Sequence, residues 1–410
     1  MAPASINSLL LRGARIIGHE HVIEQGAVLI ESGRIVLILD SETRELPAAD
    51  SVIDLKGATL FPGFIDVHIH GAAGVDAMTA TADDLKQVSE FLVREGVTAW
   101  MPTLVPASTE EYQQAIHAIT GLIRRQKAEF APAALSADGT SALPAKGARV
   151  LGVHYEGPFV NSEQCGALHR EHFRSFKDSA GLDSLPTIKQ DGVAHLMTLA
   201  PEVDGGIDLI KELCRRGWIV SIGHTRAKVE VLDQALAAGA RHMTHFMNAM
   251  TPLHHRAPGP VGWGLIRDEV TCDMIADGVH LDPSILKLIL RSKTAERISL
   301  ISDAVAPTGL GDGDYQIWGE TIRVRNGRTQ NARGSIAGSV ITMLDAVRMM
   351  LSLGASEGEV ARMASTNPAR LLGIDNDCGS IEEGKRADLV ALDKARNLRL
   401  TIAGGQVVFQ

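Results

Sequence analysis

Several features that often identify the class of a protein are missing from this chain. Its four cysteines, among 410 residues, form no C-x-x-C pair, so neither a zinc ribbon nor a dithiol redox motif is present. No run of five or more Lys or Arg occurs and the formal net charge is -9, which argues against a nucleic-acid partner. Nothing approaches the ~18 uninterrupted apolar residues of a membrane span, and the N-terminal stretch lacks the basic start of a signal peptide. We therefore expect a cytoplasmic protein with reduced thiols and no membrane anchor.

What is present is the composition of an ordinary globular protein, with 45% hydrophobic and 22% charged residues. Short apolar, partly alternating runs separated by Gly, Ser or Asp fill residues 8–60, and the last 30 residues repeat this style. We expect an antiparallel sheet here. The two chain ends, 1–62 and 375–410, are thus predicted to form one small discontinuous β-sandwich domain.

Between the ends, β-like runs alternate with helical stretches, which is typical of a parallel α/β sheet or barrel. Eight candidate strands can be counted, and eight strands predict a closed (β/α)8 barrel of the TIM type over residues 63–374. They lie near 64–70, 97–103, 149–156, 194–200, 218–224, 241–246, 270–277 and 298–303.

Two segments interrupt the alternation of β-like and helical stretches, and neither has the composition expected of a separate domain. The Ala-, Pro-, Ser- and Gly-rich stretch 128–148 is predicted to be a mobile surface loop before the third barrel strand. Residues 315–338 are predicted to be a β insertion after the eighth strand.

Two histidines stand one residue apart in "FIDVHIHGAAG". Side chains at i and i+2 of a strand share a face, so His68 and His70 could converge on one ion, and Gly71 lets the chain turn sharply. Taken alone, such a pair is more often two hydrogen-bonded strand histidines than a metal site.

Four more possible ligands stand where other predicted strands end: Glu156, His224, His245 and Asp303. The C-terminal ends of barrel strands face one shared pocket, so five strands supply six convergent ligands. A possible metal ligand could stand at one strand end by coincidence, but this is much less probable at all five strand ends. The pattern therefore predicts a metal site.

The motifs "GFIDVHIHG", "EGP", "SIGHT", "THFMNAM", "ADGVH" and "SDA", in this order and spacing, resemble the amidohydrolase superfamily from about residue 8 to the end. Cyclic amidohydrolases commonly bridge two metals with a carboxylated lysine on strand 4. Strand 4 has no lysine here, and strand 3 offers Glu156 instead. The resemblance is therefore closest to the branch that deacetylates amino-sugar phosphates.

This resemblance implies a metal held by Glu156, His224 and His245, and a second site formed by His68, His70 and Asp303 with a bridging Glu156. Zn2+ is the ion we expect, with Fe2+, Mn2+ and Co2+ as alternatives, in one or two copies per subunit. Such an ion lowers the pKa of bound water to about 7 and polarises an amide carbonyl. Asp303 would act as general base and then as general acid; the alternative is that Asp303 is only a ligand or a structural cap.

For the substrate, the resemblance implies that Asn248 and the backbone of Ala249 hold a sugar phosphate together with Arg256 from the neighbouring subunit of a homodimer. A planar guanidinium suits a phosphate, although an arginine is also commonly a solvated surface residue. His280 resembles the family histidine that contacts the sugar. His169 resembles the one that assists at the carbonyl oxygen, but Leu168 interrupts the usual Gly-Ala-His, so a plain loop histidine stays open.

The function implied is removal of acetate from N-acetyl-D-glucosamine 6-phosphate, in amino-sugar catabolism and cell-wall recycling. A related substrate such as the galactosamine epimer is the alternative. A catalytically silent scaffold of the same fold would be expected to have lost ligands, and all six are present.

Overall fold

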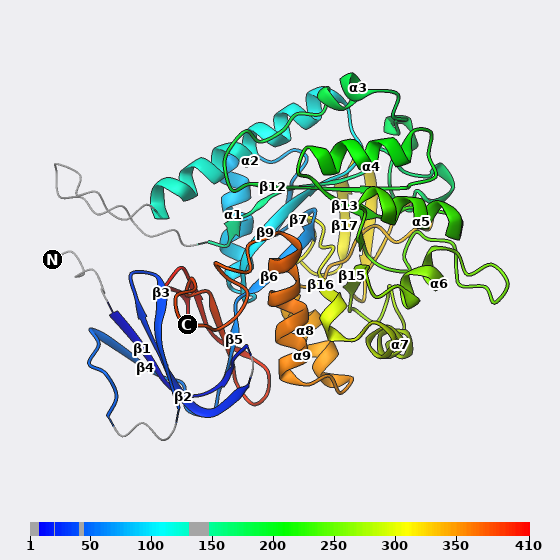
Figure 1. The fold of residues 1–410 in the computed structure, drawn as a ribbon. Coiled ribbons are helices and arrows are strands. Elements are labelled where there is room, and N and C mark those ends of the chain that lie inside the picture. Colours follow the sequence, from blue (N-terminus) through cyan, green and yellow to red (C-terminus); the bar gives the residue numbers. More distant parts are fainter. Residues whose placement is uncertain (1–7, 20, 41–44, 131–146) are drawn as a thin grey trace.

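The computed structural model describes residues 8–19, 21–40, 45–130 and 147–410 (Figure 1). Most of the predicted surface loop, residues 131–146, lies outside this range. Two bodies stand out in Figure 1: a larger one with strands at its centre and helices around them, and a smaller sheet that contains both ends of the chain. The four cysteines are free thiols.

The larger body is a barrel of parallel strands, as predicted, and the eight expected strands are all found. In sheet order the strands follow the chain from β6 to β16, and the short β10 also pairs with β9. The circle closes where the Asp303 amide donates to the His68 carbonyl (3.0 Å) and the His70 amide donates to the Ala304 carbonyl (2.8 Å). The strands are β6 (Phe64–Ile69), β9 (Val97–Leu104), β10 (Arg149–Val150), β11 (Gly152–Glu156), β12 (Ala194–Leu199), β13 (Ile219–Ile222), β14 (His242–Met243), β15 (Thr271–Ile275) and β16 (Ile298–Ile301).

Helices cover the outside of the barrel because each has one apolar face. The first, for example, begins with a capping box between Thr81 and Asp84 and buries Leu85, Val88 and Leu92. The helices are α1 (Ala82–Val93), α2 (Thr109–Phe130), α3 (Ser179–Asp183), α4 (Gly206–Arg215), α5 (Val229–Ala238), α6 (Gly259–Ile266), α7 (Pro283–Lys293), α8 (Met343–Ser352), α9 (Glu357–Ala361) and α10 (Asn367–Leu371).

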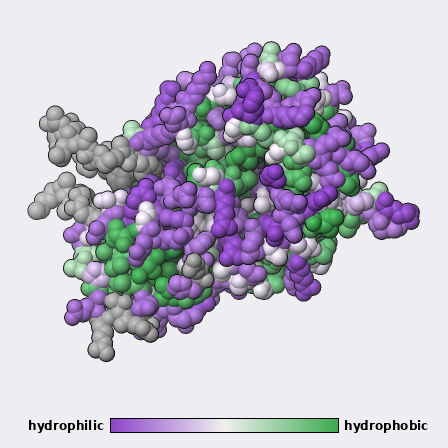
Figure 2. Space-filling model, viewed as in Figure 1, coloured by the Kyte–Doolittle hydropathy of each residue, from purple (hydrophilic) through white to green (hydrophobic). Residues whose placement is uncertain are grey.

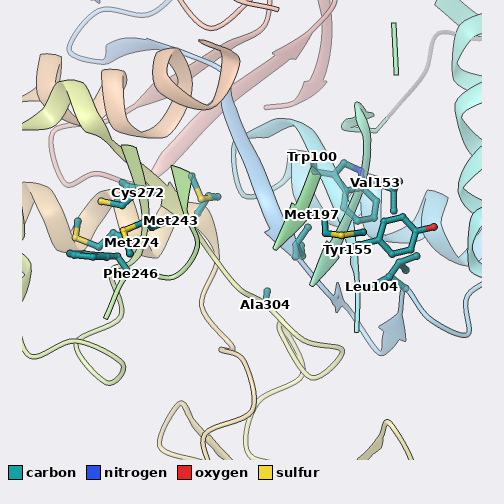
Figure 3. Close-up of a cluster of buried hydrophobic side chains, with 14 of the residues drawn as sticks. Trp100, Leu104, Val153, Tyr155, Met197, Met243, Phe246, Cys272, Met274 and Ala304 are labelled. Carbon is teal, nitrogen blue, oxygen red and sulfur yellow. The ribbon is translucent and has the colours of Figure 1, made fainter. Parts of the chain in front are cut away.

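The main hydrophobic core lies between strands and helices, and a second one fills the barrel itself. Figure 3 shows side chains of the main core in two groups on different barrel strands: Trp100, Leu104, Val153, Tyr155 and Met197 in one, and Met243, Phe246, Cys272 and Met274 in the other. With both layers closely packed, the strand ends are held in fixed positions.

The smaller body is an eight-stranded sheet made from both chain ends, as expected. It is mixed rather than antiparallel, because β1 pairs in parallel with β4 and β5 after the chain has passed through β2 and β3. Its strands are β1 (Ser8–Ile17), β2 (Val22–Glu31), β3 (Arg34–Leu39), β4 (Ser51–Asp54), β5 (Thr59–Pro62), β20 (Leu389–Leu392), β21 (Leu398–Ala403) and β22 (Gln406–Phe409). The domain boundaries at 62/63 and 374/375 stay a prediction.

On the face seen in Figure 2, the end sheet shows more hydrophobic surface than the barrel, as green at the lower left. Val22, Val36 and Val52 are exposed side chains of this sheet. The barrel face in the same view is mainly hydrophilic. No helix within the described residues is long and apolar enough to cross a membrane.

The predicted β insertion is present as a three-stranded antiparallel sheet after β16. Its strands are β17 (Gly313–Ile317), β18 (Glu320–Arg325) and β19 (Arg328–Gln330). Ile317 and Ile322 form a small core with Val305 and Ala306, which follow β16, and with Ala167 from the loop after β11. The insertion therefore lies over two of the loops that leave the C-terminal ends of the barrel strands.

Candidate metal centre

The six predicted ligands meet at the C-terminal ends of the barrel strands. His68 lies in β6 and His70 directly follows it, Glu156 ends β11, and the other three each lie two residues beyond β13, β14 or β16. None of the six is more than 7% exposed, so these ionisable groups share one almost dry site: His68, His70, Glu156, His224, His245 and Asp303. Buried groups of this kind need partners or a metal ion.

One half of the centre is formed by Glu156, His224 and His245. The Nε2 atoms of both histidines lie 2.9 Å from Oε1 of Glu156 and 3.2 Å from each other. Three donor atoms at this spacing could contact one small ion together.

The other half is formed by His68, His70 and Asp303, with Glu156 shared. The two Nε2 atoms are 3.3 Å apart, and each is 3.3 Å from Oδ1 of Asp303. Oε2 of Glu156 lies 3.4 Å from Nε2 of His70. Because Glu156 presents one oxygen to each half, it has the position of a bridging ligand.

Where a histidine of the centre is hydrogen-bonded through Nδ1, that bond decides whether its Nε2, which faces the centre, is available to a metal. Nδ1 of His224 lies 2.7 Å from the Gln164 carbonyl, which only accepts, so Nδ1 carries a hydrogen and Nε2, which faces Glu156, is the nitrogen left to bind a metal. Nδ1 of His68 is likewise bonded to Thr244 Oγ1 (3.0 Å). The donor set therefore fits a divalent metal such as zinc.

The electrostatics of the centre differ from one side chain to the next. Burial favours the neutral acid of Glu156, but hydrogen bonds from His224 and His245 outweigh it and hold the pKa of Glu156 well below its usual value. Burial, together with His154, holds the pKa of His68 well below its usual value, whereas contacts with Asp303 and Glu156 outweigh burial and raise the pKa values of His70 and His245. The shift of Glu156 favours the ionised carboxylate that a metal needs.

The backbone is strained where three of these side chains enter the site. His224, His245 and Asp303 have φ values of 46°, 27° and 51°, in the left-handed region that costs a non-glycine residue about 1–3 kcal/mol. Gly223 precedes His224 because a Cβ there would meet the Thr244 and Thr198 side chains at 2.5 and 2.7 Å. Strain of this kind is common at active sites, where it holds a side chain in one direction.

A layer of buried polar groups supports the ligands from below. Asp66 accepts a hydrogen bond from the Ser302 hydroxyl (2.5 Å), and burial raises its pKa to about 7. His154 is bonded to the Val67 carbonyl (3.1 Å) and to Thr198, and burial lowers its pKa to about 3, so it is a structural neutral imidazole. Asp66 is not among the predicted site residues, although the spacing i, i+2 on a strand places it on the same face as His68.

A further acidic residue lies beside His70 and was also missed. Asp76 belongs to the small hairpin of β7 (Gly71–Ala72) and β8 (Val75–Asp76). Burial raises its pKa to about 6, against the opposing effects of the Met78 amide, of His70 and of the Trp318 indole. The Trp318 ring itself meets the His70 ring edge to face, with 5.2 Å between centroids.

Two of the predicted substrate-binding residues, Asn248 and Ala249, are hydrogen-bonded to the backbone at or next to the metal ligands. Asn248 follows His245 and donates to its carbonyl (3.2 Å). Ala249 has a φ of 49°, and its carbonyl accepts from the Thr225 amide next to His224 (3.1 Å). These two residues therefore lie at the edge of the Glu156–His224–His245 half.

The two predicted loop histidines are each held by carboxylates. Nδ1 of His280 lies 2.6 Å from Asp277, whose pKa is lowered by this contact although burial acts the other way. His169 lies between Glu171 (3.2 Å) and Glu320 of the insertion (3.6 Å). Neither histidine is bonded to any of the six central side chains.

Arg256 does not join the cluster within its own chain. The described residues 252–258 are all exposed, and within the described part of the chain the Arg256 guanidinium is hydrogen-bonded only to the neighbouring His255 ring (2.8 Å). This segment projects from the barrel beside α6 (Figure 1). An arginine in this place can reach another molecule more easily than its own site.

Comparisons with known proteins agree with the geometry. A profile of the amidohydrolase family matches residues 59–408. N-acetylglucosamine-6-phosphate deacetylase of Bacillus subtilis (strain 168) is 35% identical over 98% of this chain and 97% of its own length. N-acetylgalactosamine-6-phosphate deacetylase of Escherichia coli O157:H7 is also 35% identical, over 97% of this chain and 98% of its own. The structure of a mutant N-acetyl-D-glucosamine-6-phosphate deacetylase from Mycobacterium smegmatis with N-acetyl-D-glucosamine-6-phosphate has a TM-score of 0.86 at 30% identity, covering 98% of this chain and 100% of that one.

Proposed function

The chain belongs to the amidohydrolase family, and from this premise we propose that it removes the acetyl group of N-acetyl-D-glucosamine 6-phosphate. The products are D-glucosamine 6-phosphate and acetate, as expected for amino-sugar catabolism and cell-wall recycling. The observation that carries the proposal is Glu156, whose two oxygens face two sets of imidazole nitrogens in a chain that matches such deacetylases over nearly its whole length.

Glu156, His224 and His245 would hold one divalent ion, for which zinc is our first choice over iron, manganese or cobalt. His68, His70 and Asp303 would hold a second, with Glu156 between the two. When bound, such an ion lowers the pKa of water and polarises the amide carbonyl. The rest of the mechanism depends on the side chains of the protein.

Asp303 is the proton carrier of the proposed reaction. Its carboxylate is 7% exposed, the most open of the six side chains, and stands at the strand end where substrate would enter. It would accept the proton of the attacking water as the new C–O bond forms, and give it to the nitrogen as the C–N bond breaks. One carboxylate can perform both transfers because the proton taken in the first step is the one needed in the second.

Recognition of the substrate would involve residues outside the six ligands. We assign the sugar to His280, the carbonyl oxygen to His169, and the phosphate to Asn248, the Ala249 amide and Arg256. The exposed position of Arg256 supports the idea that it serves the site of the neighbouring subunit in a homodimer. With its free thiols, the protein would work in the cytoplasm.

The galactosamine epimer is the second candidate substrate. It is favoured by the Escherichia coli relative named above, whose identity to this chain equals that of the Bacillus subtilis enzyme at nearly the same coverage. The two sugars differ only in the orientation of the 4-hydroxyl, so the ratio of kcat/KM for the two decides between them.

The test is acetate release by metal-loaded protein from N-acetylglucosamine 6-phosphate, its galactosamine epimer and unphosphorylated N-acetylglucosamine. The proposal expects fast release from the first substrate only. Preference for the epimer would establish the second candidate. Absence of release from all three, with metal content verified, would refute both.

A further inference from the structure

The turn between β17 and β18 contains an unexpected residue. It is a two-residue hairpin loop, Trp318–Gly319, between the paired residues Ile317 and Glu320. Both loop residues have positive φ, 51° and 75°. This conformation suits Asn, Asp or Gly, whereas a bulky side chain at positive φ is strained.

Other two-residue hairpin loops in the described residues follow the usual preference. Their first positions have φ values of 49–56° and carry small or polar residues: Ser32, Ala73, Asn326 and Gly404. The closest comparison is Asn326–Gly327, which joins β18 to β19 in the same small sheet with φ values of 51° and 72°. Of these loops, only that of Trp318 carries a bulky side chain, so local turn chemistry does not account for the tryptophan.

The contacts of Trp318 indicate what does account for it. Its ring packs edge to face on His70 (5.2 Å between centroids) and against the apolar residues that hold the insertion on the strand-end loops. Its indole N–H is buried with no hydrogen-bond partner among the described residues, and it acts to lower the pKa of Asp76 against the effect of burial. Trp318 thus touches a predicted metal ligand and favours the ionised form of the acidic residue near that ligand.

Among the described residues, the buried Nδ1 atoms of His70 and His245 have no hydrogen-bond partner, whereas those of His68 and His224 are both bonded. Of the two unpartnered rings, that of His70 packs against Trp318. Asp76 is paired across the β7–β8 hairpin with Gly71, the residue after His70, and its charge acts to raise the pKa of His70. A histidine ligand is normally oriented by a group behind its ring, and loss of that group weakens metal binding about 10–100-fold.

We propose that Trp318 and Asp76 are positioning residues for His70, so that metal binding in the His68–His70–Asp303 half depends on the tip of the β17–β18 hairpin. The inference rests on the metal site of the proposed function but not on its substrate. If Trp318 positions His70, the β insertion contributes a residue to the metal centre and does not only pack over the strand-end loops.

The experiment is calorimetric titration of Zn2+ into the metal-free full chain. Wild type should show two binding events, and His70→Ala should identify the one that belongs to the His68–His70–Asp303 half. Trp318→Asn should weaken that event about 10–100-fold and leave the other unchanged. Because Asn is favoured in this turn, the hairpin should stay folded, which the thermal unfolding midpoint checks. Asn326→Ala, in the matched turn, should change neither event.

Asp76→Asn provides an independent variant and should weaken the same event. Unchanged zinc affinity in both variants, equal weakening of both events in Trp318→Asn, or a single binding event in wild type would each overturn the inference. Wild type that binds two ions but releases no acetate would refute the proposed function and leave this inference standing.

Discussion

The two halves of the metal centre share one carboxylate but differ in how they are built. In the Glu156–His224–His245 half, both imidazole nitrogens lie 2.9 Å from Glu156. In the His68–His70–Asp303 half the two imidazole nitrogens lie 3.7 and 3.4 Å from Glu156, and each lies 3.3 Å from Asp303. The first half comes from barrel strands and the loop that carries Gln164, whereas His70 is flanked by groups from outside the barrel. The compact half is thus formed by barrel strands and one of their loops, and the wider half is also in contact with the β insertion.

The largest expected effect comes from removing what the halves share. Glu156→Gln keeps the shape of the side chain but removes the charge that faces both sets of histidines, so metal should be lost from both halves. Activity should fall further than the ~10²–10⁴-fold typical of losing a general acid–base group. Metal analysis after dialysis and acetate release measure this.

The control for Glu156→Gln is Glu212→Gln, the same chemical change on α4. It should leave metal content and activity unaltered. Metal retained at wild-type levels in Glu156→Gln would contradict the bridging position of Glu156.

Asp303→Asn tests whether Asp303, in the His68–His70–Asp303 half, transfers a proton in addition to binding metal. We expect kcat to fall about 10²–10⁴-fold because no carboxylate remains to carry the proton. Metal should stay in the Glu156–His224–His245 half. If activity instead fell only in proportion to metal lost, Asp303 would be a ligand alone.

Arg256→Ala should weaken substrate binding without changing metal binding in either half of the centre. Loss of a charged hydrogen bond to phosphate is worth about 1.5–3 kcal/mol, so KM should rise about 10–100-fold for the phosphorylated sugar. Zinc content should stay at the wild-type value. Steady-state kinetics with unphosphorylated N-acetylglucosamine is the control, and an equal loss with that compound would contradict the phosphate role.

The smallest effect is expected far from the centre, at Glu212. Hydrogen bonds from Arg215 and Arg216 lower its pKa to about 2 from a usual 4.5. Because the folded-state pKa is the lower one, this stabilisation is present above about pH 4.5 and is lost as the pH falls toward 2. Metal-free Glu212→Gln should therefore melt slightly below wild type near neutral pH, and the difference should shrink in acid. A difference that persists at about pH 2 would contradict the assignment.

Much of the architecture could be predicted because it repeats along the chain. The eight strands can be predicted from alternation alone, and the convergence of the six candidate ligands can be predicted from their place where apolar runs end. The end sheet was expected, but its parallel pairing of β1 with β4 and β5 was not, because strand direction within a sheet depends on contacts between distant segments.

The supporting groups could not be found in the same way. The partner of His224 is the backbone carbonyl of Gln164, and a carbonyl carries no signal in the side-chain sequence. Trp318 reaches His70 only because the insertion folds back over the barrel. Its one local sign is a tryptophan before glycine between two short alternating runs, where a turn prediction expects asparagine.

The pairing of β5 with β20 joins Thr59 to Leu392, near opposite ends of the chain. During synthesis on a ribosome, β1 to β5 emerge first and must wait for nearly the whole barrel before their partner strand exists. Closing so large a loop is slow, and the unpaired edge of β5 is exposed meanwhile. The N-terminal strands thus complete their sheet among the last steps of folding. A chain that stops before β20 would leave β5 without the strand that pairs with it.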